Sequence, residues 1–229
     1  KEYLPTLLCA WTGGNAVVLR AEDKQETFQA GMRSFINEAR LLAQFDHAAL
    51  VKVFRFWEEN NTAYMAMPYY DGETLRALVK HRPGIITEAW LRNTLLPPLL
   101  NALETLHGKD VYHRDVSPDN ILIQMNHAPV LLDFGAARRI ISDRVEAVTV
   151  ILKPGYAPIE QYANDKCGPW SDVYAVCAVL YFLITGTTPP PAVSRVMSDI
   201  YEPLHLRTDL SGYSADFLRA VDWIGPLPR

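Results

Sequence analysis

The sequence predicts an α+β fold made of two lobes, a small N-terminal lobe that is mostly β and a larger C-terminal lobe that is mostly α. Short apolar runs separated by turn residues fill most of residues 1–67, whereas helix-spaced apolar stretches dominate residues 73–229. A proline and a glycine interrupt the pattern within residues 68–72, where we expect a hinge. The 229 residues suit a single domain of this kind.

Composition and charge exclude several classes of protein. An apolar fraction of 49% and a charged fraction of 21% are typical of a soluble globular protein. The net charge of −4 gives no electrostatic basis for binding nucleic acid or an anionic membrane. The scattered cysteines Cys9, Cys167 and Cys177 predict reduced thiols in a cytosolic protein. No apolar run approaches the roughly 20 residues of a membrane-spanning helix, so we expect membrane contact only through an anchor outside this sequence.

Three segments of the first lobe carry clear patterns. Residues 6–20 hold two short apolar runs around a Gly-Gly turn, which predicts a hairpin-like insert. Residues 25–45 have apolar side chains at helical spacing and predict a helix with one buried face. Residues 51–57 alternate between apolar and polar and predict a strand, which a turn connects to a partner strand over residues 63–67.

A long helix beginning at Thr87 is the clearest element of the second lobe. Thr87 suits an N-cap, and a stripe of leucines follows it: Leu91, Leu95, Leu99, Leu103 and Leu106. The stripe indicates core packing without chemistry. Pro97 and Pro98 interrupt the pattern, and we expect them to kink the helix because each removes a backbone donor.

The other expected elements of this lobe are shorter or less regular. Residues 74–80 predict a short helix, and residues 172–185 predict an apolar helix that Gly186 ends. Residues 194–212 are expected to be irregular, and residues 215–224 predict a last helix.

The polar segment 113–120 lies between two short apolar runs that resemble strands, which is where a loop held at both ends is expected. Thirteen residues after Asn120, Asp133 follows another apolar run. An amide and a carboxylate at adjacent strand ends, with Asp115 five residues before the amide, can hold a divalent metal and orient a hydroxyl.

Two other interpretations of this segment fit poorly. His113, Asp115 and Asp119 do not match a common zinc-site spacing. Ser117 lacks the G-x-S-x-G context of an activated nucleophile.

The segment His113-Arg114-Asp115-Val116-Ser117-Pro118-Asp119-Asn120, followed by Asp133-Phe134-Gly135, resembles the catalytic loop and D-F-G motif of protein kinases, in particular those of bacterial serine/threonine type. The resemblance implies a bilobal protein-kinase-like fold, whose small β-rich N-lobe carries the αC helix and whose larger C-lobe is mostly α. It implies that Asp115 orients the attacking hydroxyl, and that Asn120 and Asp133 hold Mg²⁺, or Mn²⁺ in its place.

The resemblance extends to two segments of the first lobe. Residues 1–5, K-E-Y-L-P, are similar to the end of the third strand in a bacterial kinase subgroup, which makes Lys1 the lysine that holds the ATP phosphates. Glu38, in F-I-N-E-A-R-L-L, matches the αC glutamate that pairs with this lysine. Without the resemblance, Lys1 is an ordinary exposed lysine and Glu38 a solvated helix residue.

Contacts to adenine follow from the same resemblance. Met67 occupies the gatekeeper position, and Leu122 forms the floor beneath the base. The donor to adenine is expected to be the backbone N–H of Tyr70, because Pro68 has none.

The C-terminal end of the activation segment also matches the family pattern. Glu160, in P-I-E, is implied to pair with an arginine late in the chain, and Asp172 to fix the backbone of the catalytic loop. Arg114 is implied to receive a phosphate if Ser142 or Thr149 is phosphorylated.

Four departures from the family pattern stand out. No glycine-rich phosphate loop precedes Lys1, so we expect the first two strands to be missing from this sequence, and we expect the C-lobe to be incomplete at its end. Ser117 replaces the lysine that is usual two residues after the catalytic aspartate. Lys153 occupies the position of a threonine, and we hypothesise that it restores part of the lost positive charge.

The resemblance implies an ATP-dependent kinase that phosphorylates serine or threonine hydroxyls of proteins, a choice that Pro118 favours over the tyrosine-kinase pattern. We expect it in the cytoplasm, where it can be the cytosolic domain of a longer, membrane-anchored protein. The alternative is a pseudokinase that serves as a nucleotide-binding or protein-binding scaffold. A small-molecule kinase fits less well, because the P-I-E segment is recognisable.

Overall fold

The computed structural model describes residues 1–14, 16–133, 152–163 and 166–224. Of the residues singled out above, Phe134, Gly135, Ser142 and Thr149 lie outside this part of the chain. The described residues form two compact units, and the boundary between them falls between Tyr70 and Asp71.

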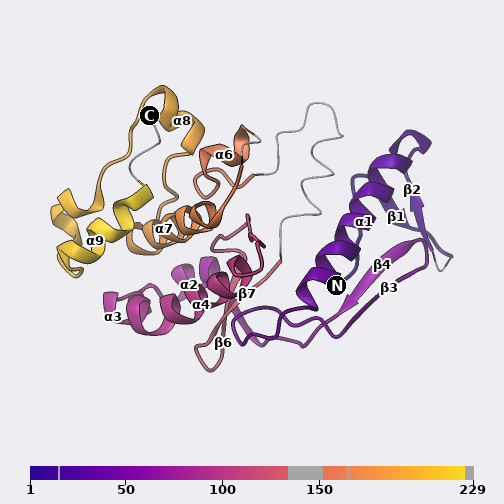
Figure 1. Ribbon diagram of the computed structural model, residues 1–229, viewed down its shortest axis with the longest axis horizontal. Helices are drawn as coiled ribbons and strands as arrows, with labels where there is room; N and C mark the ends of the chain where they lie inside the picture. The colour runs from indigo at the N-terminus through magenta and orange to yellow at the C-terminus, as the bar shows by residue number, and fades with distance from the viewer. Residues whose placement is uncertain (15, 134–151, 164–165, 225–229) are drawn as a thin grey trace. The chain divides into compact units, whose positions relative to one another are not determined.

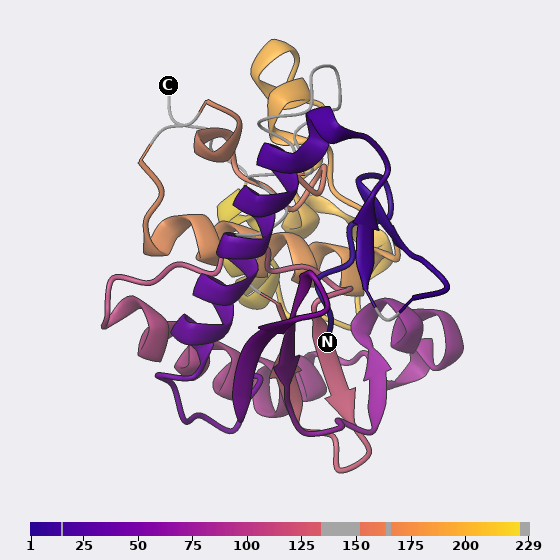
Figure 2. The same ribbon diagram turned by 90° about the vertical axis from the view of Figure 1, so that its right-hand side faces the viewer.

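The first unit contains two β-hairpins and one long helix, which packs on the second hairpin (Figure 1). Strand β1 (Cys9–Trp11) pairs antiparallel with β2 (Val17–Leu19), which confirms the predicted hairpin insert. The short helix η1 (Glu22–Lys24) leads into α1 (Gln25–Leu42), and Figure 2 shows the first hairpin beside the N-terminal half of this helix.

The second hairpin of this unit consists of β3 (Arg55–Glu59) and β4 (Thr62–Ala66). Asn60 and Asn61 form its turn with φ values of 54° and 58°, a left-handed conformation that asparagine tolerates better than most residues. The prediction that the strand begins at Val51 was wrong. The N–H of Phe54 donates to the carbonyl of Ala66, and the ladder ends there because β4 supplies no partner for earlier residues.

The apolar stripe of α1 forms the core of the first unit. Phe28, Phe35, Ala39 and Leu42 are buried, as the helical spacing predicted. Tyr3 packs against the rings of Phe28 and Phe35, with centroid distances of 5.2 and 5.8 Å. Burial of these aromatic side chains supplies much of the free energy that holds the helix on the hairpins.

The second unit contains a three-stranded antiparallel sheet in the order β5 (Gly72–Thr74), β6 (Ile121–Gln124), β7 (Pro129–Leu131). The sequence did not predict β5, which is only three residues long. The expected strand-like run that ends at Tyr112 is not a strand, since no other strand lies beside it among the described residues. Only the run after the polar loop, β6, is one.

Helices form the rest of the second unit (Figure 1). In chain order they are α2 (Leu75–His81), η2 (Pro83–Ile85), α3 (Glu88–Trp90), η3 (Leu91–Leu95), α4 (Leu96–His107), α6 (Ile159–Tyr162), α7 (Pro169–Thr185), α8 (Ala192–Met197), η4 (Leu204–Leu206), η5 (Thr208–Leu210), α9 (Ala215–Val221) and η6 (Asp222–Ile224).

The predicted helices are present with small corrections. Thr74 and Thr87 cap α2 and α3 through their side-chain oxygens, and the predicted leucine stripe is buried. A π-helical segment, η3, ends two residues before Pro97, and the expected kink stays a prediction. Residues 194–212 are not wholly irregular, because α8, η4 and η5 lie in or across that range.

Helix α7 is buried on most of its surface and forms the centre of the second unit. Gly186 ends it with φ of 72°, as predicted for a glycine stop. Among the described residues, no helix is both long and apolar enough to cross a lipid bilayer.

Candidate active site

Asp172, in the first turn of α7, holds the backbone of the polar loop 113–120. This side chain is fully buried. Its two oxygens accept from the backbone N–H groups of His113 at 2.9 Å and Arg114 at 2.8 Å, and Nε2 of His107 lies 2.8 Å from Oδ2. Arg114 has φ of 62°, an unfavourable conformation that these hydrogen bonds offset. The predicted role of Asp172 in holding the loop therefore has a direct geometric basis.

His113 is locked inside the same loop as a neutral imidazole. Its Nδ1 accepts from the backbone N–H of Asp115 at 3.3 Å, so Nε2 carries the proton and donates to the carbonyl of Leu132 at 2.9 Å. Burial lowers the pKa of His113 and outweighs the opposing attraction of Asp172 and Asp115. The ring thus ties the loop to the end of β7 without carrying charge.

Asp115 is held from one side by Asn120. The Asn120 side-chain nitrogen donates to the backbone carbonyl of Asp115 at 2.8 Å and to its Oδ2 at 2.7 Å. Asn120 is buried, so these bonds lie in a medium of low dielectric constant, where they are strong. Because the nitrogen faces Asp115, the amide oxygen of Asn120 is directed elsewhere.

Asp133 and Asn120 come together through the pairing of β6 with β7. Ile121 pairs with Leu131, and the N–H of Leu132 donates to the carbonyl of Asn120 at 2.7 Å. These contacts bring the residue before β6 close to the segment after β7. A carboxylate and an amide are hard oxygen donors, and this donor set fits Mg²⁺.

Lys153 lies on the other side of Asp115. Its Nζ is 3.3 Å from Oδ1 of Asp115 and 2.7 Å from Oγ of Ser117, to which it donates. Ser117 is fully buried, so its short side chain leaves the space that the lysine head group enters. Two residues that depart from the family pattern are therefore in direct contact, 36 positions apart in the sequence.

Lys1 and Glu38 form an ion pair in the first unit, with Nζ and Oε1 3.8 Å apart. The Glu38 side chain is 2% exposed, so the interpretation as a solvated helix glutamate was wrong. Backbone hydrogen bonds between Lys1 and Met65 continue the ladder from β4 and hold the lysine at the sheet. The Lys1 ammonium also lies 5.8 Å from the centre of the Phe35 ring.

The three residues expected at adenine belong to different units. Met67 and Tyr70 follow β4 and are half-buried, and the Tyr70 hydroxyl accepts from the N–H of Lys52 at 2.9 Å. Leu122 lies on β6 and is half-buried, whereas Ile121 and Ile123 are 0% and 2% exposed. The alternation places Leu122 on the opposite face of the sheet from its neighbours.

Sequence reasoning missed Arg76, which supports the loop from α2. Its guanidinium binds the Asp119 carboxylate through two bonds of 2.7 and 3.1 Å, and its backbone N–H donates to Pro118 at 3.1 Å. Burial raises the pKa of Asp119, but the Arg76 hydrogen bonds and charge bring the net pKa below its usual value. The only available signal was an acid beside Asn120 and an arginine in the first turn of a nearby helix.

Glu160 contacts a serine, whereas the resemblance implied an arginine. It lies in α6 and accepts from Oγ of Ser171 at 2.6 Å, which attaches the end of the activation segment to the first turn of α7. Ser171 also accepts from the N–H of Gly168 at 3.2 Å and so closes the start of that helix.

A β-rich unit in which a lysine pairs with a buried glutamate, and a helical unit with an H-R-D loop anchored on an aspartate, together define a protein kinase. The chain matches the family model described as "Protein kinase domain" over residues 10–212, and it belongs to that family. The recognition as a serine/threonine protein kinase catalytic domain of bacterial type is confirmed by its relatives.

Named serine/threonine-protein kinases are among these relatives. PknL of Mycobacterium tuberculosis is 32% identical over 193 residues, covering 78% of this chain and 48% of PknL. PknB of the same species is 36% identical over 183 residues, covering 76% of this chain and 28% of PknB. The chain thus spans about half, or less, of the length of these curated relatives.

A solved structure described as "PpkA-294 apo form" has the same fold. It is 51% identical and superposes with a TM-score of 0.91, covering 96% of this chain and 77% of that one. The predicted α+β protein-kinase-like fold is confirmed.

Proposed function

We propose that this chain catalyses transfer of the γ-phosphoryl group of ATP to serine or threonine hydroxyls of protein substrates. The observation that carries the proposal is the position of Asp115, whose two carboxylate oxygens are engaged from opposite sides by Asn120 at 2.7 Å and Lys153 at 3.3 Å. A carboxylate fixed in this way can accept a hydrogen bond from a substrate hydroxyl and aim it at a phosphorus atom. Phosphoryl transfer depends mainly on such positioning and on charge neutralisation.

The family's metal and nucleotide account for the remaining site residues. Mg²⁺ or Mn²⁺ would neutralise phosphate charge when bound, held by the Asp133 carboxylate and the Asn120 amide oxygen. Lys1, oriented by Glu38, would pair with the ATP phosphates.

Adenine contacts and regulation are assigned by the same resemblance. Met67, Leu122 and the N–H of Tyr70 would contact adenine. Arg114, exposed beside Asp115, would bind a phosphate carried by the activation segment.

Lys153 supplies, in this proposal, the cation that Ser117 cannot. In the resting chain its ammonium is shared between Asp115 and Ser117. It would shift toward the γ-phosphoryl group as negative charge develops on the transferred oxygens, because an ammonium beside a dry site interacts most strongly with the larger charge. Its place on the activation segment would make this cation available only when that segment is correctly folded.

The domain organisation and location are proposed on the same basis. Residues 68–72, which span the boundary between the two units, would act as the hinge of a single kinase domain over residues 1–229. We place the domain in the cytoplasm, where ATP and protein substrates are available.

The test is transfer of labelled phosphate from ATP to a serine/threonine peptide library by the full-length protein. We expect Asp115→Ala to reduce kcat by about 10³-fold, the scale of a positioned acid–base group. Asp216→Ala is the matched control, because that side chain is 94% exposed and lies in α9. Equal rates for both variants, or label on tyrosine alone, would refute the proposal.

A further inference from the structure

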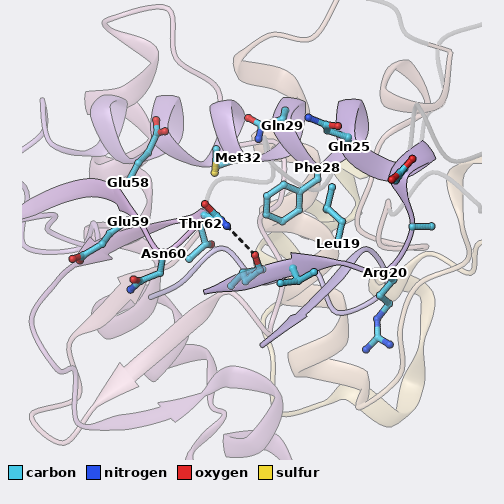
Figure 3. Close-up of a pocket in the computed structure, with 15 residues that line it drawn as sticks. Leu19, Arg20, Gln25, Phe28, Gln29, Met32, Glu58, Glu59, Asn60 and Thr62 are labelled. Carbon is cyan, nitrogen blue, oxygen red and sulfur yellow. Dashed lines mark hydrogen bonds between the residues drawn. The ribbon is translucent and has the colours of Figure 1, made fainter. Parts of the chain in front are cut away.

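A groove in the first unit runs between α1 and strand β2, with the β3–β4 turn at one end (Figure 3). Its volume is about 920 Å³. None of the residues proposed for phosphoryl transfer lines it. Helix α1 lies along one side of the groove and the strand that carries Leu19 lies along the other (Figure 3).

Strand β2 presents an open edge to this groove. Arg20 donates from its N–H to the carbonyl of Leu8, so the antiparallel pattern makes Cys9 and Leu19 a pair without mutual hydrogen bonds. The backbone N–H and carbonyl of Leu19 therefore point away from β1. Those of Val17 point the same way and meet Asn60 and Asn61, which line the groove. Within the described residues, the two Leu19 groups have no hydrogen-bond partner.

The floor of the groove is apolar and its rim is acidic. Phe28 and Met32 are 3% and 8% exposed and form the base, as Figure 3 shows. The rim carries the exposed carboxylates Glu22, Glu58 and Glu59. The one basic residue in the lining, Arg20, is turned away and donates from Nε to the carbonyl of Thr6 at 2.8 Å.

We propose that this groove binds an extended, basic segment of a partner protein, which adds a strand to the edge of β2. Strand addition satisfies the two unpaired backbone groups of Leu19 and places alternate side chains over the apolar floor. Lysine or arginine side chains between those anchors meet the carboxylates of the rim, and the complementary charge selects basic partners over acidic ones.

The groove is connected to the Lys1–Glu38 pair through Tyr3. The Tyr3 hydroxyl donates to the carbonyl of Phe28 at 3.2 Å, and Thr62, also in the lining, donates to the carbonyl of Tyr3. Tyr3 lies two residues after Lys1 and packs on Phe35, over which the Lys1 ammonium sits. An occupant that contacts Phe28 and Thr62 therefore touches two residues that are hydrogen-bonded to Tyr3, which shares the Phe35 ring as a neighbour with Lys1.

Binding is tested without nucleotide, so the outcome does not depend on the proposed kinase activity. The probe is the fluorescein-labelled peptide Lys-Val-Lys-Leu-Lys-Val-Lys, titrated with the full chain and followed by fluorescence anisotropy. We expect saturable binding that weakens with added salt. A peptide with glutamate in place of every lysine should bind at least about tenfold more weakly.

Two matched comparisons separate strand addition from general attraction to an acidic protein. The double variant Glu58→Lys, Glu59→Lys should weaken binding about tenfold, whereas Glu104→Lys, Asp216→Lys, which reverses two exposed carboxylates in the second unit, should not. N-methylation of the central peptide leucine and valines should also weaken binding, because it removes the N–H donors that reach the Leu19 carbonyl. Hydrogen exchange of the Leu19 amide in the unsubstituted chain should slow on binding.

Several results would overturn the proposal. These are no binding of the lysine peptide, equal losses in the two double variants, unchanged affinity after N-methylation, or unchanged exchange at Leu19. Because the Leu19 measurement uses the unsubstituted chain, a folding defect in a variant cannot account for it.

Discussion

The site around Asp115 differs from the family pattern in where its cation originates. Ser117 and Lys153 both depart from the family pattern, and together they place an ammonium 2.7 Å from the Ser117 hydroxyl and 3.3 Å from the Asp115 carboxylate. A lysine at 117 and a small residue at 153 would deliver the charge from the loop itself. Here it comes from the activation segment.

Exchange of the two residues tests whether the cation has been relocated. We expect Lys153→Thr to lower kcat by about 10²-fold, the scale of a lost transition-state donor. Adding Ser117→Lys to that variant should recover at least about tenfold, because the new lysine returns the charge to the same space. The measurement is steady-state kinetics of peptide phosphorylation.

Lys109→Thr serves as the control for this exchange, since it removes an exposed lysine from the same unit. If the double variant is no faster than Lys153→Thr alone, the positive charge of Lys153 is not its contribution to the reaction.

Single site residues could be predicted from the sequence where their motif is local. Residues whose partners are distant in the sequence could not. Asp115 and Asn120 are five positions apart, and Asp133 follows a recognisable apolar run, so all three could be predicted. Arg76 acts on Asp119 across 43 positions and His107 on Asp172 across 65. Neither has a local pattern, because only the packing of α2 and α7 on the loop brings them there.

The long helix of the second unit shows how an element can accommodate an irregular repeat. The stripe from Leu91 to Leu103 advances by four residues each time, and four residues turn a regular α-helix about 40° too far. The π-helical segment η3 has wider turns, shown by the bond from the N–H of Leu96 to the carbonyl of Leu91. It brings the leucines back into line directly before Pro97 and Pro98, which cannot donate to the preceding turn.

Glu88 joins two elements of the second unit and should make their association depend on pH. Its carboxylate accepts from the N–H and hydroxyl of Ser214, the N-cap of α9, while Arg92 pairs with it along the helix. The hydrogen bond from the Ser214 backbone, which exceeds the opposing effect of burial, lowers the pKa of Glu88 below its usual value. The native state therefore binds this proton less readily than the unfolded chain.

The sign of the effect follows from linkage. Stabilisation by Glu88 is complete above the unfolded glutamate pKa of about 4.3 and is lost as pH falls through the lower native value. We expect Glu88→Gln to be less stable than the unsubstituted chain at neutral pH by about 1 kcal/mol. The two should converge once the pH falls below the lowered native pKa of Glu88.

Urea unfolding between neutral and acidic pH measures this difference. Glu104→Gln, at an exposed position on α4, should show a much smaller difference at every pH. A constant gap between Glu88→Gln and the unsubstituted chain down to acidic pH would contradict the assignment.

Helices with several turns of apolar spacing were predictable, and very short elements were not. The spacing over α1, α4 and α7 repeats often enough to exceed chance. Strand β5 and helix α8 have only three and six residues, so their patterns are too short to distinguish from a loop. Both form because of contacts with β6 or with the chain around Arg195 and Asp199, which pair at 2.9 Å.

Across the whole molecule, the proposed site residues divide between the two units. Lys1, Glu38, Met67 and Tyr70 belong to the first, and the others belong to the second. Residues of both sets could be predicted from sequence motifs, because each set lies within local patterns of its own. The groove between α1 and β2 could not be predicted from a sequence motif. Its open strand edge can be identified only when the register of β1 and β2 is known.

Glu38 provides a test of the first unit's contribution to the reaction of the whole domain. We expect Glu38→Ala to raise the KM for ATP about tenfold, because Lys1 loses the carboxylate that directs it. Removing one partner of a buried ion pair leaves the other charge uncompensated, so we also expect this variant to be less stable.

Steady-state kinetics and thermal unfolding on the same samples separate the two effects. Glu26→Ala, at an exposed position in the first turn of α1, is the matched control. An unchanged KM for ATP would show that the Lys1–Glu38 pair is structural only.

Burial of His113 makes the stability of the folded chain depend on pH. In the unfolded chain a histidine takes up a proton near pH 6.5, whereas burial keeps the native ring unprotonated there. Below that pH the unfolded state binds more protons than the native state, so each further drop in pH favours unfolding. Burial of His113 therefore makes the native state less stable in mild acid than at neutral pH.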